Sequence, residues 1–340
     1  MENNSAKEQN GMNSVLWGFF FEKLLQNIAA LVAVVDSAGG IVFANGKYLE
    51  YFSLSEKDAY GKDWIDSILP VARRTEIRAM FDNVKGTDIP VRFEMPSGIE
   101  SGPGKHISWS GIPLKEKEFM LYMFIGYESS GIKGRPVKVY GLDKVGLDET
   151  YKGVVEELFK ASMVADGETA KHAARVMSIA VLLAEKVGIS EERIERLKAA
   201  SLLHDLGKLA VDEKILFKKG KLDEAEFEEI KKHSKWGADV VQLIYFLRDI
   251  VPIMANHHEN YDGSGYPKGV KGEDIPLEAR ILGIADIYEA LTADRPYRKG
   301  FTVDEAAALI ESEKEKKLDP RLTDIFLDMV SHGELKEVDI

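Results

Sequence analysis

The chain has 340 residues, a length typical of two domains, and its 45 Lys and Arg against 57 Asp and Glu give a formal net charge of −12. This acidic balance disfavours binding to nucleic-acid polymers and to anionic membranes, but not to a small phosphorylated substrate held through metal ions. Cysteine is absent, which excludes disulfides, thiolate metal sites and a cysteine nucleophile.

The first part of the chain predicts a mixed domain of helices and strands. Residues 1–14 are polar, carry no signal peptide and are expected to be disordered. Residues 15–28 have apolar side chains four apart, which predicts a helix. Two short apolar runs around the turn Ser37-Ala-Gly-Gly40 predict a β-hairpin. Helical segments are expected from there to about residue 85, and strands at 89–95, 105–114 and 119–127.

This order of elements over residues 15–127 resembles a PAS domain. The resemblance is carried by the hairpin from Val34 to Asn45, by Tyr60-Gly-Lys-Asp-Trp64 and by Trp109-Ser-Gly-Ile-Pro-Leu114. It implies an antiparallel sheet with flanking helices that serves as a sensor or forms a homodimer. A plain α+β domain used only for packing stays open as the alternative.

An all-α domain is expected after a linker. Residues 128–148 are rich in glycine and show little periodicity, which is typical of a linker. Over residues 149–340 helical spacing dominates, and no strand alternation competes with it. The expected helices are Thr150–Val164, Ala170–Lys186, Glu191–Leu206, Asp223–Lys232, Gly237–Ile244, Arg248–Asn256, Leu277–Ala293 and Val303–Lys316.

Histidines and carboxylates of this helical domain occur in patterns that favour metal binding. His204 lies on the apolar face of its helix and should point inward, with Asp205 beside it. Because a buried carboxylate requires a partner, a metal ion or another cation is expected next to Asp205. His257 and His258 are adjacent, so on a helix their side chains diverge by about 100° and can reach different ions. Asp286 lies in a mostly apolar helical segment and needs a partner for the same reason.

Three further candidates have weaker signals when taken alone. Glu168 and His172 are four residues apart and share one face of a helix, but such a pair is more often a solvated Glu and a surface or core His. His233 ends a charged helix, where the helix dipole also favours a histidine. Together the candidates exceed one tetrahedral site and indicate two or three Fe, Mn or Zn ions. The full set is Glu168, His172, His204, Asp205, His233, His257, His258 and Asp286.

Residues 145–335 resemble an HD-GYP domain, a branch of the HD phosphohydrolases. The matching strings are His204-Asp205, His257-His258-Glu259, Gly265-Tyr266-Pro267 and the segment from Ala285 to Arg298. The resemblance implies hydrolysis of the bacterial second messenger cyclic di-GMP at a centre of two or three metal ions. The implied product is pGpG, which a three-metal site would convert to GMP.

The resemblance also implies a role for individual residues. The implied metal ligands are His172, His204, Asp205, His233, His257, His258 and Asp286, with Asp205 as the bridging and catalytic carboxylate. Glu168 matches the position that holds a third metal ion in some members, and Lys208 matches a lysine that faces the phosphate. Tyr266, Arg295 and Arg298 match substrate-contacting positions, and the GYP segment matches a surface for protein contact. Glu289 departs from the pattern, because many members have Asp there.

Three functions stay open at this point. The first is a cyclic di-GMP phosphodiesterase gated by the N-terminal domain, and the second is an HD phosphohydrolase that acts on another cyclic or linear nucleotide. The third is a receptor without activity, which the complete ligand set disfavours. A cytoplasmic location is expected, because the chain has neither a signal peptide nor an apolar stretch suited to a bilayer.

Overall fold

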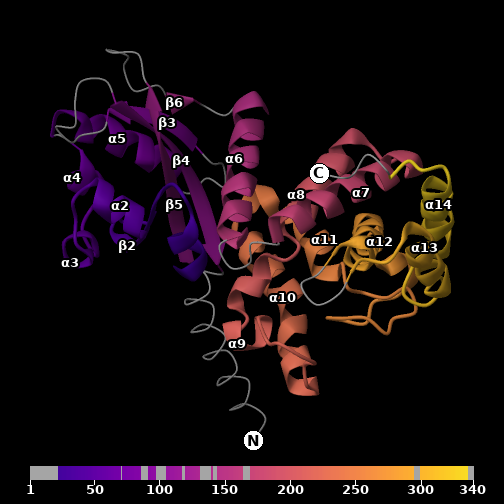
Figure 1. The fold of residues 1–340 in the computed structure, drawn as a ribbon. Helices are drawn as coiled ribbons and strands as arrows, with labels where there is room; N and C mark the ends of the chain where they lie inside the picture. The colour runs from indigo at the N-terminus through magenta and orange to yellow at the C-terminus, as the bar shows by residue number, and fades with distance from the viewer. Residues whose placement is uncertain are drawn as a thin grey trace, which may run out of the picture. The chain divides into compact units, whose positions relative to one another are not determined.

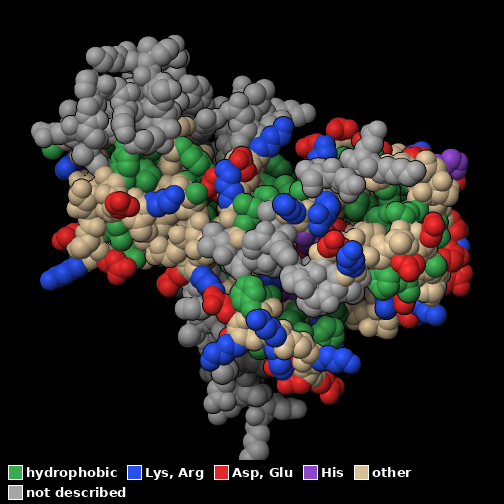
Figure 2. Space-filling model, in the orientation of Figure 1, with side chains coloured by type: hydrophobic (Ala, Val, Ile, Leu, Met, Phe, Trp, Pro, Cys, Tyr) green, Lys and Arg blue, Asp and Glu red, His purple; other side chains and the backbone are tan. Residues whose placement is uncertain are grey.

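The computed structural model describes residues 22–69, 71–85, 91–96, 105–116, 119–130, 139–140, 144–163, 169–294 and 299–335. The chain divides into two compact units, Met1–Ala161 with Leu243–Phe246 and Ser162–Gln242 with Leu247–Ile340 (Figure 1). The disorder expected for residues 1–14 lies outside the described residues. Within the described ranges, no helix is both long and apolar enough to cross a membrane. Acidic and basic side chains are interspersed over the face shown in Figure 2.

The first unit is built on an antiparallel sheet with the strand order β2-β1-β5-β4-β3-β6. The strands are β1 (Leu31–Val35), β2 (Ile41–Ala44), β3 (Val91–Pro96), β4 (Lys105–Glu116), β5 (Phe119–Ser130) and β6 (Val139–Tyr140). The predicted hairpin is confirmed: Asp36 Oδ1 accepts hydrogen bonds from the backbone amides of Ala38 and Gly40, and Gly39 has a φ of +92°. Strand β6 falls within the expected linker, where it pairs with the edge of β3.

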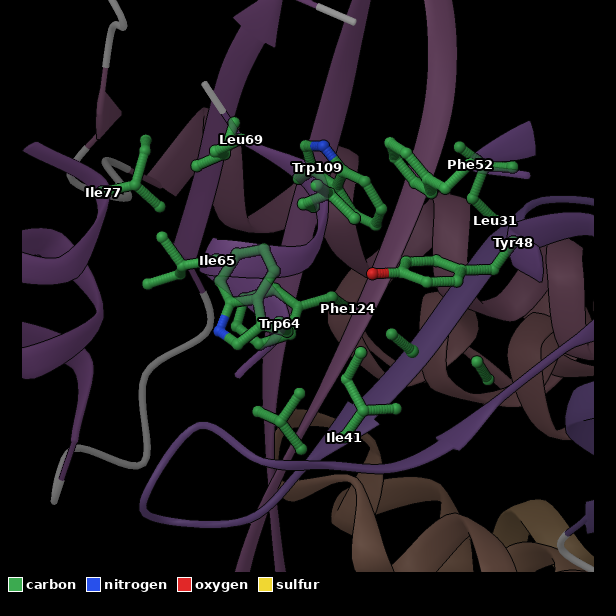
Figure 3. Packing of buried hydrophobic residues seen from close by; sticks show 14 of the residues in the cluster. Leu31, Ile41, Tyr48, Phe52, Trp64, Ile65, Leu69, Ile77, Trp109 and Phe124 are labelled. Atoms are coloured by element: carbon green, nitrogen blue, oxygen red, sulfur yellow. The ribbon is translucent and has the colours of Figure 1, made fainter. Parts of the chain in front are cut away.

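Helices cover one face of this sheet and enclose an aromatic core (Figures 1 and 3). They are α2 (Gly46–Tyr51), α3 (Glu56–Ala59), α4 (Trp64–Ile68) and α5 (Val71–Val84), and a further helical segment spans residues 22–27. Trp64 stacks on Phe124 with ring centroids 4.3 Å apart, and Trp109 is fully buried beside them. Each such buried ring stabilises the fold by roughly 1.5–3 kcal/mol.

The other face of the sheet carries helix α6 (Lys144–Met163). Alternate residues of β5 point to this face, and Met123 and Ile125 are buried there. Tyr127, on the same face of β5, hydrogen-bonds Glu157 of α6. The expected domain boundary stood at residue 149, whereas the compact units divide after Ala161, because the buried apolar side of α6 belongs to the first unit.

The second unit is helical. Its elements are α7 (Thr169–Val187), α8 (Glu191–Leu203), η1 (Leu206–Ala210), α9 (Glu213–Leu216), α10 (Glu224–Leu243), η2 (Tyr245–Ile250), α11 (Val251–Asn256), η3 (Gly272–Asp274), α12 (Leu277–Thr292), α13 (Val303–Ser312) and α14 (Pro320–Ser331). The all-α prediction is confirmed for the described residues. The last residue of α10, Leu243, and the first two residues of η2, Tyr245 and Phe246, are grouped with the first unit.

Several details of the helix prediction are wrong. The helix expected over Arg248–Asn256 is the end of η2 followed by α11, and the helix expected over Val303–Lys316 ends at Ser312 as α13. The two helices expected on either side of residues 233–236 are one continuous helix, α10, and Gly237 lies inside it at the point of closest approach to η1. Helix α8 ends at Leu203, three residues early, because the chain tightens there into η1. Helix α14 was not expected, although Asp319 caps it by accepting from the amides of Arg321 and Leu322.

Candidate metal centre

Five elements of the second unit bring the predicted ligands together. Helix α7 supplies His172, and the junction between α8 and η1 supplies His204 and Asp205. His233 lies on α10, His257 and His258 follow α11, and Asp286 lies on α12. Three groups of these residues have ligand atoms within 4.8 Å of one another. They are His172, His204 and Asp286, then His204, Asp205 and His257, and finally His233, His257 and His258.

The junction that carries Asp205 requires a glycine. A Cβ atom on Gly207 would lie 2.0 Å from the carbonyl oxygen of His233 and 2.7 Å from the amide nitrogen of Gly237. Only a residue without a side chain allows η1 to approach the backbone of α10 this closely. This contact brings the carboxylate of Asp205 beside the imidazole of His233.

Asp205 lies between two sets of imidazoles. Its Oδ2 is 3.4 Å from His204 Nε2 and 3.8 Å from His172 Nε2, and its Oδ1 is 3.4 Å from His233 Nε2. Nitrogen ligands of one ion, each about 2.0–2.1 Å from it, lie roughly 3–4 Å apart. The two carboxylate oxygens therefore face two neighbouring ligand sets, which is the arrangement of a bridging carboxylate.

Asp286 completes the first of these sets. Its Oδ1 is 3.3 Å from His172 Nε2, and the Nε2 atoms of His172 and His204 are 3.4 Å apart. Asp286 thus has the partner that its apolar helix led us to expect.

The imidazoles present the nitrogen that a metal ion would need. The Nδ1 atoms of His204, His233 and His257 donate to the backbone carbonyls of Ser201, Ile230 and Met254 at 2.6–2.7 Å. These bonds fix the tautomer and leave Nε2 as the free ligand atom. The Nε2 atoms of His233 and His257 are buried and have no hydrogen-bond partner. Buried polar atoms without partners are rare, and a metal ion would satisfy both.

The electrostatics favour charged carboxylates and mostly neutral imidazoles. Burial lowers the pKa of His233 and His257, and it lowers the pKa of His258 to about 3. Burial opposes ionisation of Asp205 and Asp286, but the nearby histidines, with Lys208 at Asp205, hold both pKa values below the usual range. These are the protonation states in which such groups bind metal ions.

His172 differs from the other imidazoles because it is surrounded by carboxylates. Burial opposes its charged form, but hydrogen bonds to Asp286 and Glu289 prevail and raise its pKa to about 9. Without a metal ion, the charge on this imidazole therefore balances part of the negative charge of the centre.

Glu289 is the residue that the sequence flagged without giving it a role. It is 1% exposed, its Oε2 accepts from His172 Nδ1 at 2.5 Å, and its Oε1 accepts from Arg175 Nε at 2.9 Å. A second nitrogen of the Arg175 guanidinium also contacts Oε1. Carboxylates commonly orient metal-binding histidines in this way. Arg175 was missed, although its position one helical turn after His172 was a usable signal.

The GYP segment folds back over His258. The Tyr266 amide donates to the carbonyl of His258 at 3.1 Å, and the two rings have centroids 4.8 Å apart. Glu259 holds the returning chain, because its carboxylate accepts from the amides of Lys268 and Val270 at 2.7 and 3.1 Å. A Cβ atom on Gly265 would collide with the backbone of residues 258–260, so this position also requires glycine.

A cavity of about 390 Å³ opens beside the ligands. Its lining includes His257, His258 and Asp286, together with Tyr266 and residues from the N-terminal half of α10. Tyr266 thus lines the same cavity as three of the predicted metal ligands.

Lys208 donates to Asp205 Oδ2 at 2.6 Å and keeps 34% of its side chain exposed, so it reaches the centre from the solvent side. Glu168, Arg295 and Arg298, for which the sequence predicted roles, lie outside the described residues.

Comparisons with known proteins agree with this arrangement. Residues 161–322 match the HD domain family, and residues 20–94 match the PAS fold. The expectation of a PAS domain followed by a helical HD domain is thereby confirmed.

Three curated relatives each match between half and three fifths of the chain. The cyclic di-GMP phosphodiesterase response regulator RpfG of Xanthomonas campestris is 38% identical over 183 residues, which are 53% of this chain and 48% of that protein. The 3'3'-cGAMP-specific phosphodiesterase 2 of Vibrio cholerae is 36% identical over 54% of this chain and 36% of its own length. A cyclic di-GMP phosphodiesterase of Thermotoga maritima is 33% identical over 60% of this chain and 58% of its own. The chain spans about half the length, or less, of the first relatives it matches.

Proposed function

We propose that this protein, with its PAS and HD domains, is a metal-dependent phosphodiesterase that hydrolyses cyclic di-GMP to pGpG. The observation that carries the proposal is the position of Asp205 between two ligand sets, with one oxygen 3.4 Å from His204 and the other 3.4 Å from His233. Adjacent divalent ions are suited to phosphate esters, because together they activate water and stabilise the attacking and leaving oxygens.

The protein's own residues would do the remaining work. Asp205 would hold two ions at a fixed separation, and the carbonyl-bonded histidines would keep their Nε2 atoms directed at those ions. Lys208, which is part exposed, would place a positive charge near the non-bridging oxygens of the phosphate. Tyr266 would contact the substrate from the wall of the cavity.

The proposed ions are Fe or Mn, both of which imidazole and carboxylate donors suit. Glu168 would hold a third ion, and a three-metal centre would carry pGpG on to GMP. Arg295 and Arg298 would contact the substrate through its second phosphate or a guanine edge.

The named activities of the relatives support cyclic dinucleotides as the substrate class, since two of the three relatives described above are called cyclic di-GMP phosphodiesterases. A second candidate substrate is 3′3′-cyclic GMP-AMP, because other relatives, 36% and 38% identical, are named for it. The two substrates differ in one base and would use the same metal centre.

The test is metal analysis combined with a substrate panel. The protein is purified without oxygen, its Fe, Mn and Zn contents are measured, and cyclic di-GMP, 3′3′-cyclic GMP-AMP and linear pGpG are supplied under reducing conditions. Turnover of cyclic di-GMP that a chelator abolishes and added metal restores supports the proposal. A loaded protein that binds cyclic di-GMP without cleaving it would instead be a receptor.

We propose that the first unit is a sensor that forms a homodimer and controls the activity of the second unit. The proposed location of the protein is the cytoplasm. The GYP segment is proposed to be a surface for contact with another protein. A shortened chain that begins near residue 143 should keep its metal ions and some activity but lose regulation. If the shortened chain has the same hydrolysis rate and oligomeric state as the full chain under all conditions, the sensor role is wrong.

A further inference from the structure

An aromatic side chain stands exposed at the cavity beside the metal centre. Phe227 lies in the first turn of α10, lines the cavity and is 47% exposed. Lys231 follows one helical turn later and lines the same cavity. Exposed aromatic surface at the edge of a cavity is a common sign of a binding site.

Successive contacts join Phe227 to the metal centre. Lys231 Nζ lies 4.9 Å from the ring centroid of Phe227 and 5.6 Å from that of Tyr266. The Tyr266 ring in turn lies 4.8 Å from that of the metal ligand His258. A ligand that reaches from the metal ions along this wall would therefore meet an aromatic ring, an ammonium group and a second aromatic ring.

Lys231 can respond to a ligand at this wall. Its ammonium is bonded to Glu228 at 2.5 Å, but the Glu228 side chain is 59% exposed. An ion pair with so exposed a partner is weak, so it would compete poorly with a phosphodiester. Of the other cations in the cavity lining, Arg280 is engaged more firmly, because it binds the buried Asp319, and Lys317 binds Glu313 at 3.1 Å.

We propose that Phe227 is the platform on which one purine base of the cyclic dinucleotide stacks, with Lys231 opposite the phosphate that is not cleaved. This inference rests on the proposed function and extends it to substrate recognition. A cyclic dinucleotide carries two bases and two phosphodiesters, so when one phosphate is at the metal ions the rest of the ring must lie against a neighbouring wall. Stacking on an aromatic face accepts any purine, which fits a substrate class defined by its ring and charge.

Steady-state kinetics give the first test. Phe227→Ala should raise KM for cyclic di-GMP about tenfold to a hundredfold, the loss expected for one stacked base, and change kcat little. Phe227→Tyr should restore KM, whereas Phe227→Leu, which keeps the apolar bulk without the aromatic face, should not. Phe217→Ala is the matched control, because Phe217 is 54% exposed and does not line the cavity.

The cation is tested with a neighbouring pair of lysines. Lys231→Met should raise KM, whereas Lys232→Met should not, because Lys232 binds Glu229 and lies over Trp236, away from the cavity lining. Metal content should stay unchanged in every variant, which separates this wall from the metal centre.

Direct binding distinguishes this inference from the proposed activity. A cyclic dinucleotide that contains 2-aminopurine, whose fluorescence falls when the base stacks, is titrated into chelator-treated full chain. Quenching by the wild type that is lost in Phe227→Ala supports the stacking platform. If the wild type shows this quenching but cleaves no cyclic dinucleotide, the platform stands and only the proposed activity fails. Quenching that persists in Phe227→Ala, or a KM equal to that of the wild type, would overturn the platform.

Discussion

Replacement of Glu289 by Gln tests how the centre holds His172. The Glu289 carboxylate accepts from two donors at once, His172 Nδ1 through Oε2 and Arg175 through Oε1. Glutamine has one acceptor oxygen and one amide group that only donates. If the oxygen faces His172, the amide opposes the Arg175 guanidinium. If the amide faces His172, the imidazole must carry its proton on Nε2, which removes a metal ligand.

Either arrangement weakens metal binding. Loss of a partner of this kind typically lowers metal affinity about 10- to 100-fold, which corresponds to about 1.4–2.7 kcal/mol. Glu289→Asp, which introduces the residue that the resemblance favours, keeps both acceptor oxygens but shortens the side chain by one methylene. We expect its affinity to fall between those of the wild type and Glu289→Gln.

The assay is competition for Mn²⁺ between the full chain and a chromophoric chelator, with thermal unfolding measured in parallel. The matched control is Glu278→Gln on the same helix, because Glu278 is a buried carboxylate that accepts from Arg193 at 2.6 and 2.9 Å without contacting a metal ligand. Both variants should lose stability, but only Glu289→Gln should lose metal affinity. Equal metal affinities for Glu289→Gln and Glu278→Gln would refute the positioning role of Glu289.

Four further predictions concern the centre and the contacts that build it. Asp205→Ala should lower the rate of cyclic di-GMP hydrolysis by at least about two orders of magnitude, because it removes the bridging carboxylate; a rate near that of the wild type would contradict the bridge. Glu168→Ala should lower the metal content by about one ion per chain without unfolding the protein, and a content of two ions in both proteins would exclude a third site. The pKa of His172 is raised to about 9 from an ordinary 6.5, so protonation of this imidazole stabilises the metal-free fold fully below pH 6.5. The melting temperature of chelator-treated protein should therefore fall as the pH rises from 6.5 to 9. His172→Gln should make this fall smaller. Gly207→Ala should destabilise the fold by about 1–3 kcal/mol or more and lower the metal content. Gly153→Ala is the control and should do neither, because a Cβ atom at Gly153 meets nothing within 4 Å. A normal metal content in Gly207→Ala would show that the contact with His233 can relax.

Local patterns were sufficient for much of the fold. The hairpin before residue 45 could be predicted because its turn is closed by residues two to four apart, as the bonds from Asp36 show. The all-α character of the second unit followed from helical spacing, which is also local. The ligand inventory was readable for a similar reason, since His204-Asp205 and His257-His258 are adjacent pairs whose residue types alone indicate metal chemistry.

Contacts between distant parts of the chain could not be predicted in this way. Glu289 is 117 residues from His172, and no local pattern distinguishes it from a solvated helical carboxylate. The continuity of α10 through Gly237 depends on the approach of η1, so propensity alone gave two helices instead of one. Phe227 looked like one more apolar residue of α10 until the fold placed it at the cavity wall. In each case the role of the residue depends on a contact with a residue of another helix or loop. That contact forms only when these elements pack together, and their packing depends on the whole chain.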